Sequence, residues 1–239
     1  MRRFYAPVSS FSDAAVTLSE DETRHLRDVL RLHVGDEVSV FDGTGREFRS
    51  TIASIEKKIS ELLIVEEIQP TSPESPLDLT IAPTVLNGEK YDLIVQKAVE
   101  LGVSCLIPLI TVRCDVKVND AMKRLDRWRR IALEATKQCG RAMLMEIGEP
   151  IAFEELASGP NKSDAVMFSE RDGKDFSTLS PANKITALFG PKGGWDDIEL
   201  DLARKNGINV VTLGGRILRA ETAAIALTAI LQNRFGDVN

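Results

Sequence analysis

The sequence predicts an α/β protein whose main domain holds a mostly parallel sheet, preceded by a small β-rich domain. Three observations indicate this fold class. Residues 1–69 contain several short runs rich in Val, Ile and Phe, residues 70–76 carry three prolines, and residues 77–239 alternate apolar runs with helical patterns. Such alternation is typical of a parallel sheet, and the proline-rich stretch has the composition of a linker.

The first domain is expected to be a small β-barrel. Its strands are predicted at residues 37–41, 48–55 and 62–68, with turns at Gly35 and at residues 42–45. A short helix is expected at residues 20–30, where Leu26, Val29 and Leu30 share a face. The basic side chains of this domain either form an RNA-binding edge or a solvated face, and they are Arg2, Arg3, Arg24, Arg27 and Arg31.

The second domain begins with a predicted strand at residues 77–82. Apolar side chains then follow at helical spacing over residues 91–99, and a buried strand is predicted at residues 103–110. Asn119 can cap a long helix that ends before Gly140. The outer face of this helix is basic, with Lys123, Arg124, Arg127, Arg130 and Lys137. A further strand is predicted at residues 165–168.

Residues 185–224 contain two copies of one plan, an apolar strand that leads into a glycine-rich loop and then a helix. The first loop is 190–194 and the second begins at Gly214-Gly215; Asp196 and Glu199 form a capping box for the first helix. Parallel strands place such loops side by side at their carboxyl ends, where open α/β sheets bind ligands. A single Gly-Gly often only ends a strand, but two such junctions predict a pocket built largely from main chain.

Composition excludes several classes of protein. The net charge of −6 argues weakly against a nucleic-acid partner. The three cysteines form no C-x-x-C pair and only two histidines are present, so neither a zinc site nor a disulfide framework is expected. We find no apolar run long enough for a membrane span and no signal-peptide core, which makes a cytoplasmic location the expectation. The G-x-G-x-x-G and P-loop signatures are both missing. Residues 113–141, however, carry nine Lys or Arg against four Asp or Glu, which favours a nucleic-acid partner.

Seven motifs resemble those of a known family. They are RRFYAP, HLRDVLRLHVGDEVSVFDG, VQKAVELGV, PLITVRC, EATKQCGR, FGPKGGW and LGGRILRAETA, in that order. Together they resemble the ribosomal RNA small-subunit methyltransferase E (RsmE) family of the SPOUT superfamily. The resemblance runs nearly end to end, and the last motif is the most specific.

This resemblance implies a PUA-like β-barrel at residues 1–69 that helps to hold RNA, a linker at 70–76, and a SPOUT methyltransferase domain at 77–239. The C-terminal part of that domain would thread through itself as a trefoil knot. Periodicity and spacing in the sequence do not predict such a knot, because chains almost never thread loops. The family works as a homodimer in ribosome biogenesis and uses S-adenosylmethionine, without a metal or a membrane. It methylates N3 of one uridine in 16S ribosomal RNA.

The resemblance also implies roles for individual residues. The cofactor would contact Phe189, Gly190, Pro191, Gly193, Gly194, Leu213, Gly214, Ile217, Leu218, Ala220 and Thr222. For that reaction, the acidic proton on uridine N3 calls for a cation at the uracil carbonyls and a base, and we assign an arginine, Arg219 or Arg216, to the carbonyls and Glu221 to the proton. Glu221 has a simpler alternative role at the start of its helix. RNA would contact Arg2, Arg3, Arg27, Arg31, Lys97, Lys123, Arg127, Lys137 and Arg141. For Arg141, a charge at a helix C-terminus is the alternative.

One position departs from the family pattern. The family usually has GPEGG, whereas this chain has GPKGG, so an ammonium replaces a carboxylate at Lys192. Because a lysine beside a sulfonium would be repelled, Lys192 is expected to point outward and is not among the predicted cofactor residues. Three other functions stay open at this point. They are a SPOUT enzyme with another RNA target, such as a ribose hydroxyl, a non-catalytic ribosome-assembly factor that binds RNA, and a nucleotide-binding α/β enzyme.

Overall fold

The computed structural model describes residues 1–159 and 164–238, which divide into two compact units. One unit comprises Met1–Glu74 with Thr136–Leu144, and the other comprises Ser75–Ala135 with Met145–Asn239. The segment 136–144 therefore belongs with the N-terminal unit, although it lies within the range 77–239 that the sequence assigned to the other domain.

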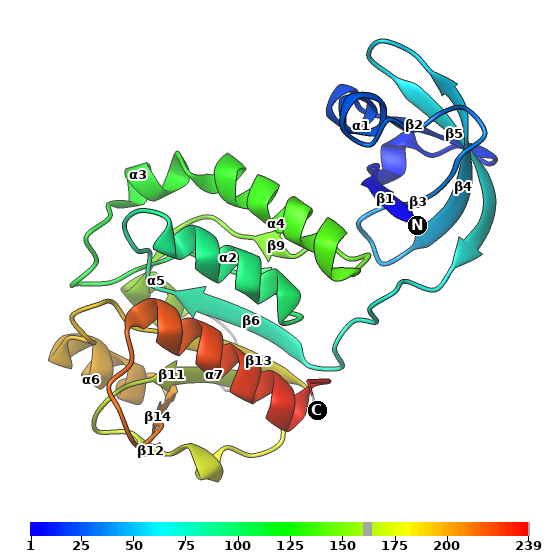
Figure 1. Cartoon of the computed structure of the whole chain (residues 1–239). Helices are drawn as coiled ribbons and strands as arrows, with labels where there is room; N and C mark the ends of the chain where they lie inside the picture. Colours follow the sequence, from blue (N-terminus) through cyan, green and yellow to red (C-terminus); the bar gives the residue numbers. More distant parts are fainter. Residues whose placement is uncertain (160–163, 239) are drawn as a thin grey trace. The chain divides into compact units, whose positions relative to one another are not determined.

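The N-terminal unit is built on a strongly curved five-stranded sheet in the order β1-β3-β4-β5-β2 (Figure 1). Strands β1 and β3 are parallel, and the other neighbours are antiparallel. The strands are β1 (Arg2–Tyr5), β2 (Ala15–Leu18), β3 (Glu37–Phe41), β4 (Glu47–Ile55) and β5 (Ser60–Ile68). The strands predicted at 37–41, 48–55 and 62–68 are thereby confirmed.

The predicted helix at residues 20–30 is also present, in two parts. Helix α1 (Glu20–Arg24) begins at Ser19, whose hydroxyl accepts a hydrogen bond from the Glu22 amide, and a π-helical turn continues to Val29. Leu26 turns inward from this turn and is fully buried, whereas Val29 is exposed. Leu26 shares its core with alternate side chains of the strands, among them Phe4, Val16, Leu18, Val38, Val40, Phe48, Ile52 and Leu62.

The second unit contains a seven-stranded sheet in the order β12-β14-β11-β13-β6-β7-β9, in which every pair is parallel. The strands are β6 (Asp78–Pro83), β7 (Cys105–Leu106), β9 (Glu146–Ile147), β11 (Ala165–Phe168), β12 (Lys174–Asp175), β13 (Lys184–Phe189) and β14 (Asn209–Thr212). This confirms the predicted parallel sheet. Two further short strands, β8 (Leu109–Ile110) and β10 (Ile151–Ala152), pair with each other.

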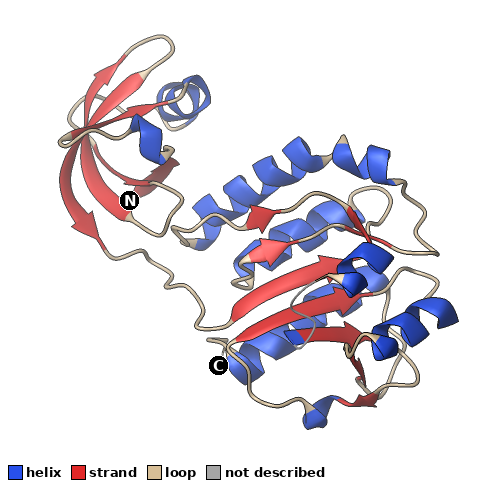
Figure 2. Ribbon diagram, turned by 180° about the vertical axis from the view of Figure 1, so that it is seen from behind, coloured by secondary structure: helices blue, strands red, loops and turns tan. Residues whose placement is uncertain are grey.

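Helices cover both faces of this sheet (Figures 1 and 2). Helices α2 (Lys90–Glu100) and α7 (Ala220–Phe235) lie on one face, and α5 (Phe153–Ser158) and α6 (Asp197–Lys205) lie on the other. After β14, α7 returns across the sheet to contact α2 and β13. The threading of this closing segment through a knot stays a prediction.

Two predicted elements are divided in the structure. The single strand expected at 103–110 is instead β7 and β8, which are separated by Ile107 and Pro108, because proline has no amide to donate to a ladder. The long helix expected from Asn119 is instead α3 (Val118–Met122) followed by α4 (Leu125–Cys139). In the described part of the chain, no helix is long and apolar enough to cross a membrane.

Candidate active site

A cavity of about 520 Å³ opens at the carboxyl ends of β11, β13 and β14. Its wall begins at the last residues of these strands, Phe168, Phe189 and Thr212, and continues into the loops that follow. Two glycine-containing loops and the start of α7 complete it. They contribute Gly190, Pro191, Lys192, Gly193, Gly194, Trp195, Leu213, Gly214, Gly215, Arg216, Ile217, Leu218, Ala220, Ala223 and Leu227. The two loops that the sequence singled out therefore meet at one cavity.

The first loop needs glycine because other groups press against its backbone. A Cβ on Gly190 would lie 2.9 Å from Nε1 of Trp195, and one on Gly194, whose φ is +71°, would collide with the Glu170 carboxylate. Trp195 is itself fixed, since it is buried and its Nε1 donates to the Phe168 carbonyl oxygen at 2.7 Å. Helix α6 then starts from the predicted capping box of Asp196 and Glu199.

The second loop is open. No atom lies within 4 Å of a Cβ built on Gly214 or Gly215, and Gly215 has a φ of +109°, which favours glycine. Within the described chain, the backbone between Gly214 and Leu218 forms no hydrogen bond with other parts of the protein. Because backbone amides and carbonyls seek partners, this loop offers both donors and acceptors to a ligand.

The inner wall of the cavity is apolar. The rings of Phe168 and Phe189 are stacked with 5.5 Å between their centroids, and these residues are in register on the neighbouring strands β11 and β13. Ala223 and Leu227 of α7 also line the cavity. Such a site would suit a ligand that has a flat aromatic group and polar atoms that can form hydrogen bonds with the main chain.

The structure separates the predicted catalytic residues. Arg216 lines the cavity, whereas Arg219 is the exposed N-cap of α7 and does not line it. Glu221 is also outside the lining, where its carboxylate pairs with Nζ of Lys90 at 2.9 Å. The hydrogen bond from Lys90 is the main cause that lowers the pKa of Glu221. Of the predicted cofactor residues, all except Thr222 line the cavity.

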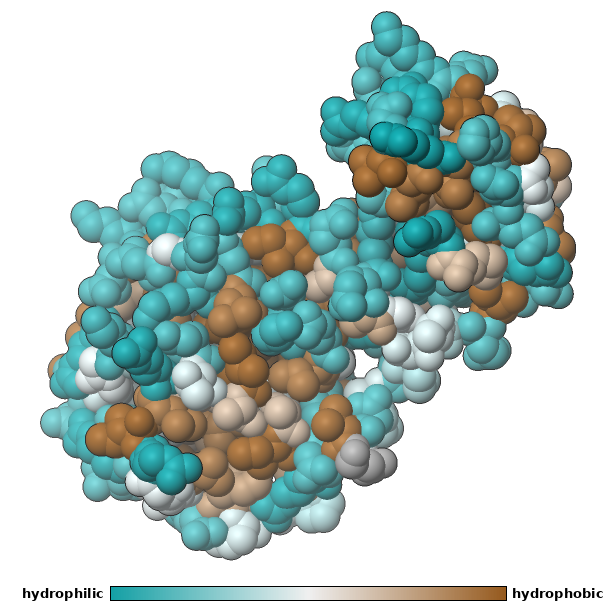
Figure 3. Space-filling view, in the orientation of Figure 1, coloured by the Kyte–Doolittle hydropathy of each residue, from teal (hydrophilic) through white to brown (hydrophobic). Residues whose placement is uncertain are grey.

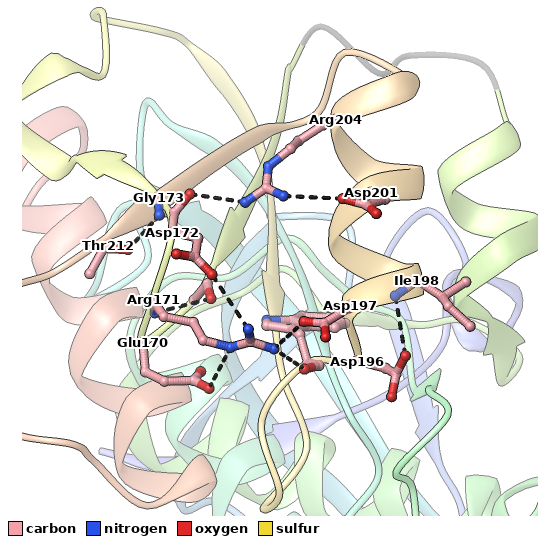
Figure 4. Close-up of polar contacts among 12 residues, drawn as sticks. Glu170, Arg171, Asp172, Gly173, Asp196, Asp197, Ile198, Asp201, Arg204 and Thr212 are labelled. Atoms are coloured by element: carbon pink, nitrogen blue, oxygen red, sulfur yellow. Dashed lines mark hydrogen bonds and ion pairs between the residues drawn. The ribbon is translucent and has the colours of Figure 1, made fainter.

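Sequence reasoning missed several residues around the first loop. Arg113 donates to the carbonyl oxygens of Gly193 and Trp195 and pairs with Asp196 at 3.1 Å. Arg171 also donates to the Trp195 carbonyl and to Asp197 (Figure 4). Glu170 lines the cavity, and so does Lys192, although Lys192 is exposed. For Glu170 and Arg171, the available signal was the charged run Glu170-Arg171-Asp172, which is separated by one residue from the strand predicted at 165–168.

The predicted RNA-binding residues fall into two groups. Three are enclosed in ion pairs of the N-terminal unit: Arg3 with Glu47 at 2.8 Å, Lys137 with Glu22 at 2.8 Å, and Arg141 with Glu74 at 2.7 Å. Their side chains are at most 11% exposed, so little of each cation is open to a ligand in this structure. The remaining six reach solvent to differing degrees, and they are Arg2, Arg27, Arg31, Lys97, Lys123 and Arg127.

Most of these outward cations have acidic partners. Arg127 pairs with Asp92, Lys123 with Asp120, Arg27 with Asp28, and Lys97 with Glu100. Such exposed pairs are weak, so the cations remain accessible to a phosphate. The part of the chain that the structure describes contains no group of acidic, histidine or cysteine side chains that could hold a metal ion.

Comparisons with known proteins match both units. The model of an RNA methyltransferase domain matches residues 73–232, and that of an RNA methyltransferase PUA domain matches residues 18–65. A ribosomal RNA small subunit methyltransferase E from Synechocystis is 33% identical over 91% of this chain and 73% of its own length. One from Bacillus subtilis is 30% identical over 90% of this chain and 88% of its own.

Solved structures give the same result. A ribosomal RNA small subunit methyltransferase E from Neisseria gonorrhoeae, bound to S-adenosyl methionine, superposes with a TM-score of 0.90 at 34% identity over 100% of both chains. A second structure, from Legionella pneumophila with bound SAM, has a TM-score of 0.90 at 30% identity and covers 99% of this chain and 98% of its own.

Proposed function

This chain belongs to the ribosomal RNA small subunit methyltransferase E family, and from that membership we propose that it methylates the RNA of the small ribosomal subunit with S-adenosylmethionine. The observation that carries the proposal is the cavity that the two glycine loops form at the carboxyl edge of the sheet. Its volume of about 520 Å³ lies within the range of about 300–1,000 Å³ of small-molecule sites.

The residues present suit this cofactor. The stacked Phe168 and Phe189 provide an apolar wall for a base, and the unpaired backbone of residues 214–218 provides donors and acceptors for its polar edge. Gly214 and Gly215 leave open space where a side chain would otherwise stand. When bound, S-adenosylmethionine supplies an electrophilic methyl group on a sulfonium.

We further propose that the acceptor is N3 of a uridine in 16S ribosomal RNA. This nitrogen carries a weakly acidic proton, so the enzyme has to stabilise charge on the uracil carbonyl oxygens and accept the proton. Arg216 and Arg219 would donate to the carbonyl oxygens. Glu221 would accept the proton, but its lowered pKa makes it a weak base. The larger contribution is therefore assigned to the arginines and to correct placement, which supplies about 7–11 kcal/mol in favourable cases.

Exposed cations would position the RNA. We assign this role to Arg2, Arg31, Lys123 and Arg127, because their side chains reach solvent. Phosphate contacts of this kind fix the orientation of an RNA without reading its sequence. The target base then has to leave its stack to reach a buried methyl donor.

A homodimer is also proposed. Ile217 is 86% exposed beside the cavity, and Leu218 is 39% exposed. Ile225 and Ile230 of α7 are only partly buried, and Figure 3 shows apolar surface over the region of α7 and α2. A second copy that covers this surface would account for it. Analytical ultracentrifugation tests this: a monomer at micromolar concentration would contradict the homodimer.

The decisive experiment is methylation of small-subunit RNA from cells that lack this protein. Incubation with the full chain and S-adenosylmethionine should add one methyl group, and mass spectrometry of the nucleosides should identify 3-methyluridine. A methylated ribose would instead assign another acceptor to the same site. If no methyl group is transferred although the cofactor binds, the protein would be an RNA-binding assembly factor.

A further inference from the structure

One carboxylate in the cavity has no role in the function proposed above. Glu170 is the second residue after β11, and among the described residues that line the cavity it is the sole acidic one. Its side chain is 40% exposed, and a carboxylate oxygen lies against Cα of Gly194, where any side chain would collide with it. The first glycine loop therefore leaves room specifically for this carboxylate.

The segment that carries Glu170 is held on both sides. Arg171 bonds to Asp197 at 2.6 Å and to the Trp195 carbonyl oxygen at 3.3 Å, which joins the segment to the start of α6. The Gly173 amide donates to Oγ1 of Thr212 at 3.0 Å, and Arg204 donates to the Asp172 carbonyl oxygen. Figure 4 shows Glu170 beside this network. The position of its backbone is therefore fixed before any ligand arrives.

The carboxylate itself retains most of its hydrogen-bonding capacity. Its contact with Nε of Arg171 is long, at 4.0 Å, and no hydrogen bond to its oxygens was found within the described chain. An ionised carboxylate has about four acceptor sites and no donor. A carboxylate with open acceptor sites, carried on a fixed backbone at the wall of a cavity, is suited to hydroxyl or ammonium groups of a ligand.

The topology favours hydroxyl groups of a ribose. Phe168 and Phe189 are in register on neighbouring parallel strands, so Glu170 follows the strand beside the one that leads into the glycine loop. In dinucleotide-binding sheets, an acidic residue beyond a neighbouring strand accepts hydrogen bonds from ribose hydroxyls. Phe168, one ring of the aromatic pair that would receive the base, lies two residues before Glu170. We propose that Glu170 accepts hydrogen bonds from the ribose diol of the bound nucleoside, an inference that rests on the proposed cofactor.

The test uses two nucleosides that share the ribose, S-adenosylhomocysteine and 5′-methylthioadenosine, of which the second lacks the amino-acid part. Calorimetric titration of the full chain should show that Glu170→Ala weakens both by about tenfold, because each nucleoside would lose its hydrogen bonds to a charged acceptor. Asp201→Asn is the matched control, since Asp201 belongs to the same polar network but is 78% exposed and lies outside the cavity lining. It should leave both affinities unchanged.

A change in the ligand gives a second test. The unaltered chain should bind 5′-methylthio-2′-deoxyadenosine about tenfold more weakly than 5′-methylthioadenosine, and Glu170→Ala should abolish that difference. Equal affinity of the unaltered chain for the two nucleosides would overturn the proposal. So would a loss confined to S-adenosylhomocysteine, which would place Glu170 at the amino-acid end. If the unaltered chain binds none of these nucleosides, the cofactor proposal itself fails.

Discussion

Arg113 and Arg171 donate hydrogen bonds to the same acceptor, the main-chain carbonyl oxygen of Trp195, and each bond is 3.3 Å long. The two arginines come from different segments, one after β8 and the other after β11. Each also pairs with an aspartate at the start of α6, Asp196 or Asp197. Together they fix the end of the first glycine loop.

We expect Arg113→Met and Arg171→Met each to weaken S-adenosylhomocysteine binding about three- to tenfold, because the loop would lose charge-assisted hydrogen bonds that pre-form it. Calorimetry provides the measurement. Arg129→Met is the control, since Arg129 pairs with Asp126 within α4 and does not line the cavity. Unchanged affinity in both variants would mean that the loop keeps its shape without them.

Two glycine substitutions should affect different properties, one the stability of the fold and the other the affinity for a nucleoside. Gly190→Ala places a methyl group 2.9 Å from Nε1 of Trp195, and overpacking of this kind costs about 1–3 kcal/mol of unfolding free energy. Gly214→Ala meets no atom within 4 Å, so unfolding free energy should change by less than about 0.5 kcal/mol. Its methyl group would, however, occupy space beside the cavity and weaken nucleoside binding. Thermal unfolding and calorimetry separate the two outcomes, and equal stability of both variants would contradict this account.

Arg3 should prove to be a stabilising residue. Its guanidinium donates to Glu47 and to the carbonyl oxygens of Thr136 and Arg141, and the Glu47 side chain is only 3% exposed. Arg3→Met would leave that carboxylate buried without its partner, at a cost of about 3–5 kcal/mol in unfolding free energy.

The neighbouring Arg2 is exposed, so Arg2→Met serves as the control and should leave the free energy of unfolding unchanged. The double variant Arg3→Met with Glu47→Met should recover part of the loss, since no charge remains buried. If Arg3→Met instead weakened RNA binding without affecting stability, the original assignment of Arg3 to RNA would be correct.

The Lys90–Glu221 pair predicts a pH dependence. Lys90 lowers the pKa of Glu221 in the folded state, so the pair stabilises the fold above the ordinary glutamate pKa, and this stabilisation is lost as pH falls through the lowered value. At pH 7, Lys90→Met should cost at most about 1 kcal/mol, because Lys90 is about half exposed. At a pH below the lowered value the difference from the unaltered chain should vanish. Urea denaturation at both pH values measures this difference in unfolding free energy. As the control, Lys90→Met introduced into a Glu221→Gln variant should not change the unfolding free energy at either pH.

The exposed cations near α4 should contribute to RNA affinity through charge. Lys123→Glu with Arg127→Glu should weaken RNA binding and reduce the slope of log affinity against log salt by about one to two. Arg204→Glu with Lys205→Glu on α6 gives the same change in net charge and is the control. An unchanged slope for the first double variant would show that these cations do not contact RNA.

The parallel sheet and the two loops could be predicted from the sequence because both depend on local patterns. Apolar runs at 185–189 and 209–213 that break at glycines indicate strands and their ends, and the register of parallel strands then brings the loops together. The split of the strand at 103–110 was missed, since its apolar composition masked the effect of Pro108.

The supporting residues could not be predicted, because their partners are distant in sequence. Arg113 is 80 residues from Gly193, to which it donates, and no local pattern indicates that contact. The same reason applies to the enclosed cations that were assigned to RNA. A count of positive charge does not distinguish a solvated lysine from Lys137, whose partner Glu22 lies 115 residues away.

The N-terminal unit is not a contiguous stretch of sequence. Its second piece, Thr136–Leu144, supplies Lys137 and Arg141, which neutralise Glu22 and Glu74 of the first piece. A gene fragment that ends at Glu74 would thus encode a unit in which the buried carboxylate of Glu22 lacks its counterion and the partly exposed carboxylate of Glu74 lacks its ion-pair partner. Moving this unit into another protein would therefore require both pieces, 1–74 and 136–144, to move together.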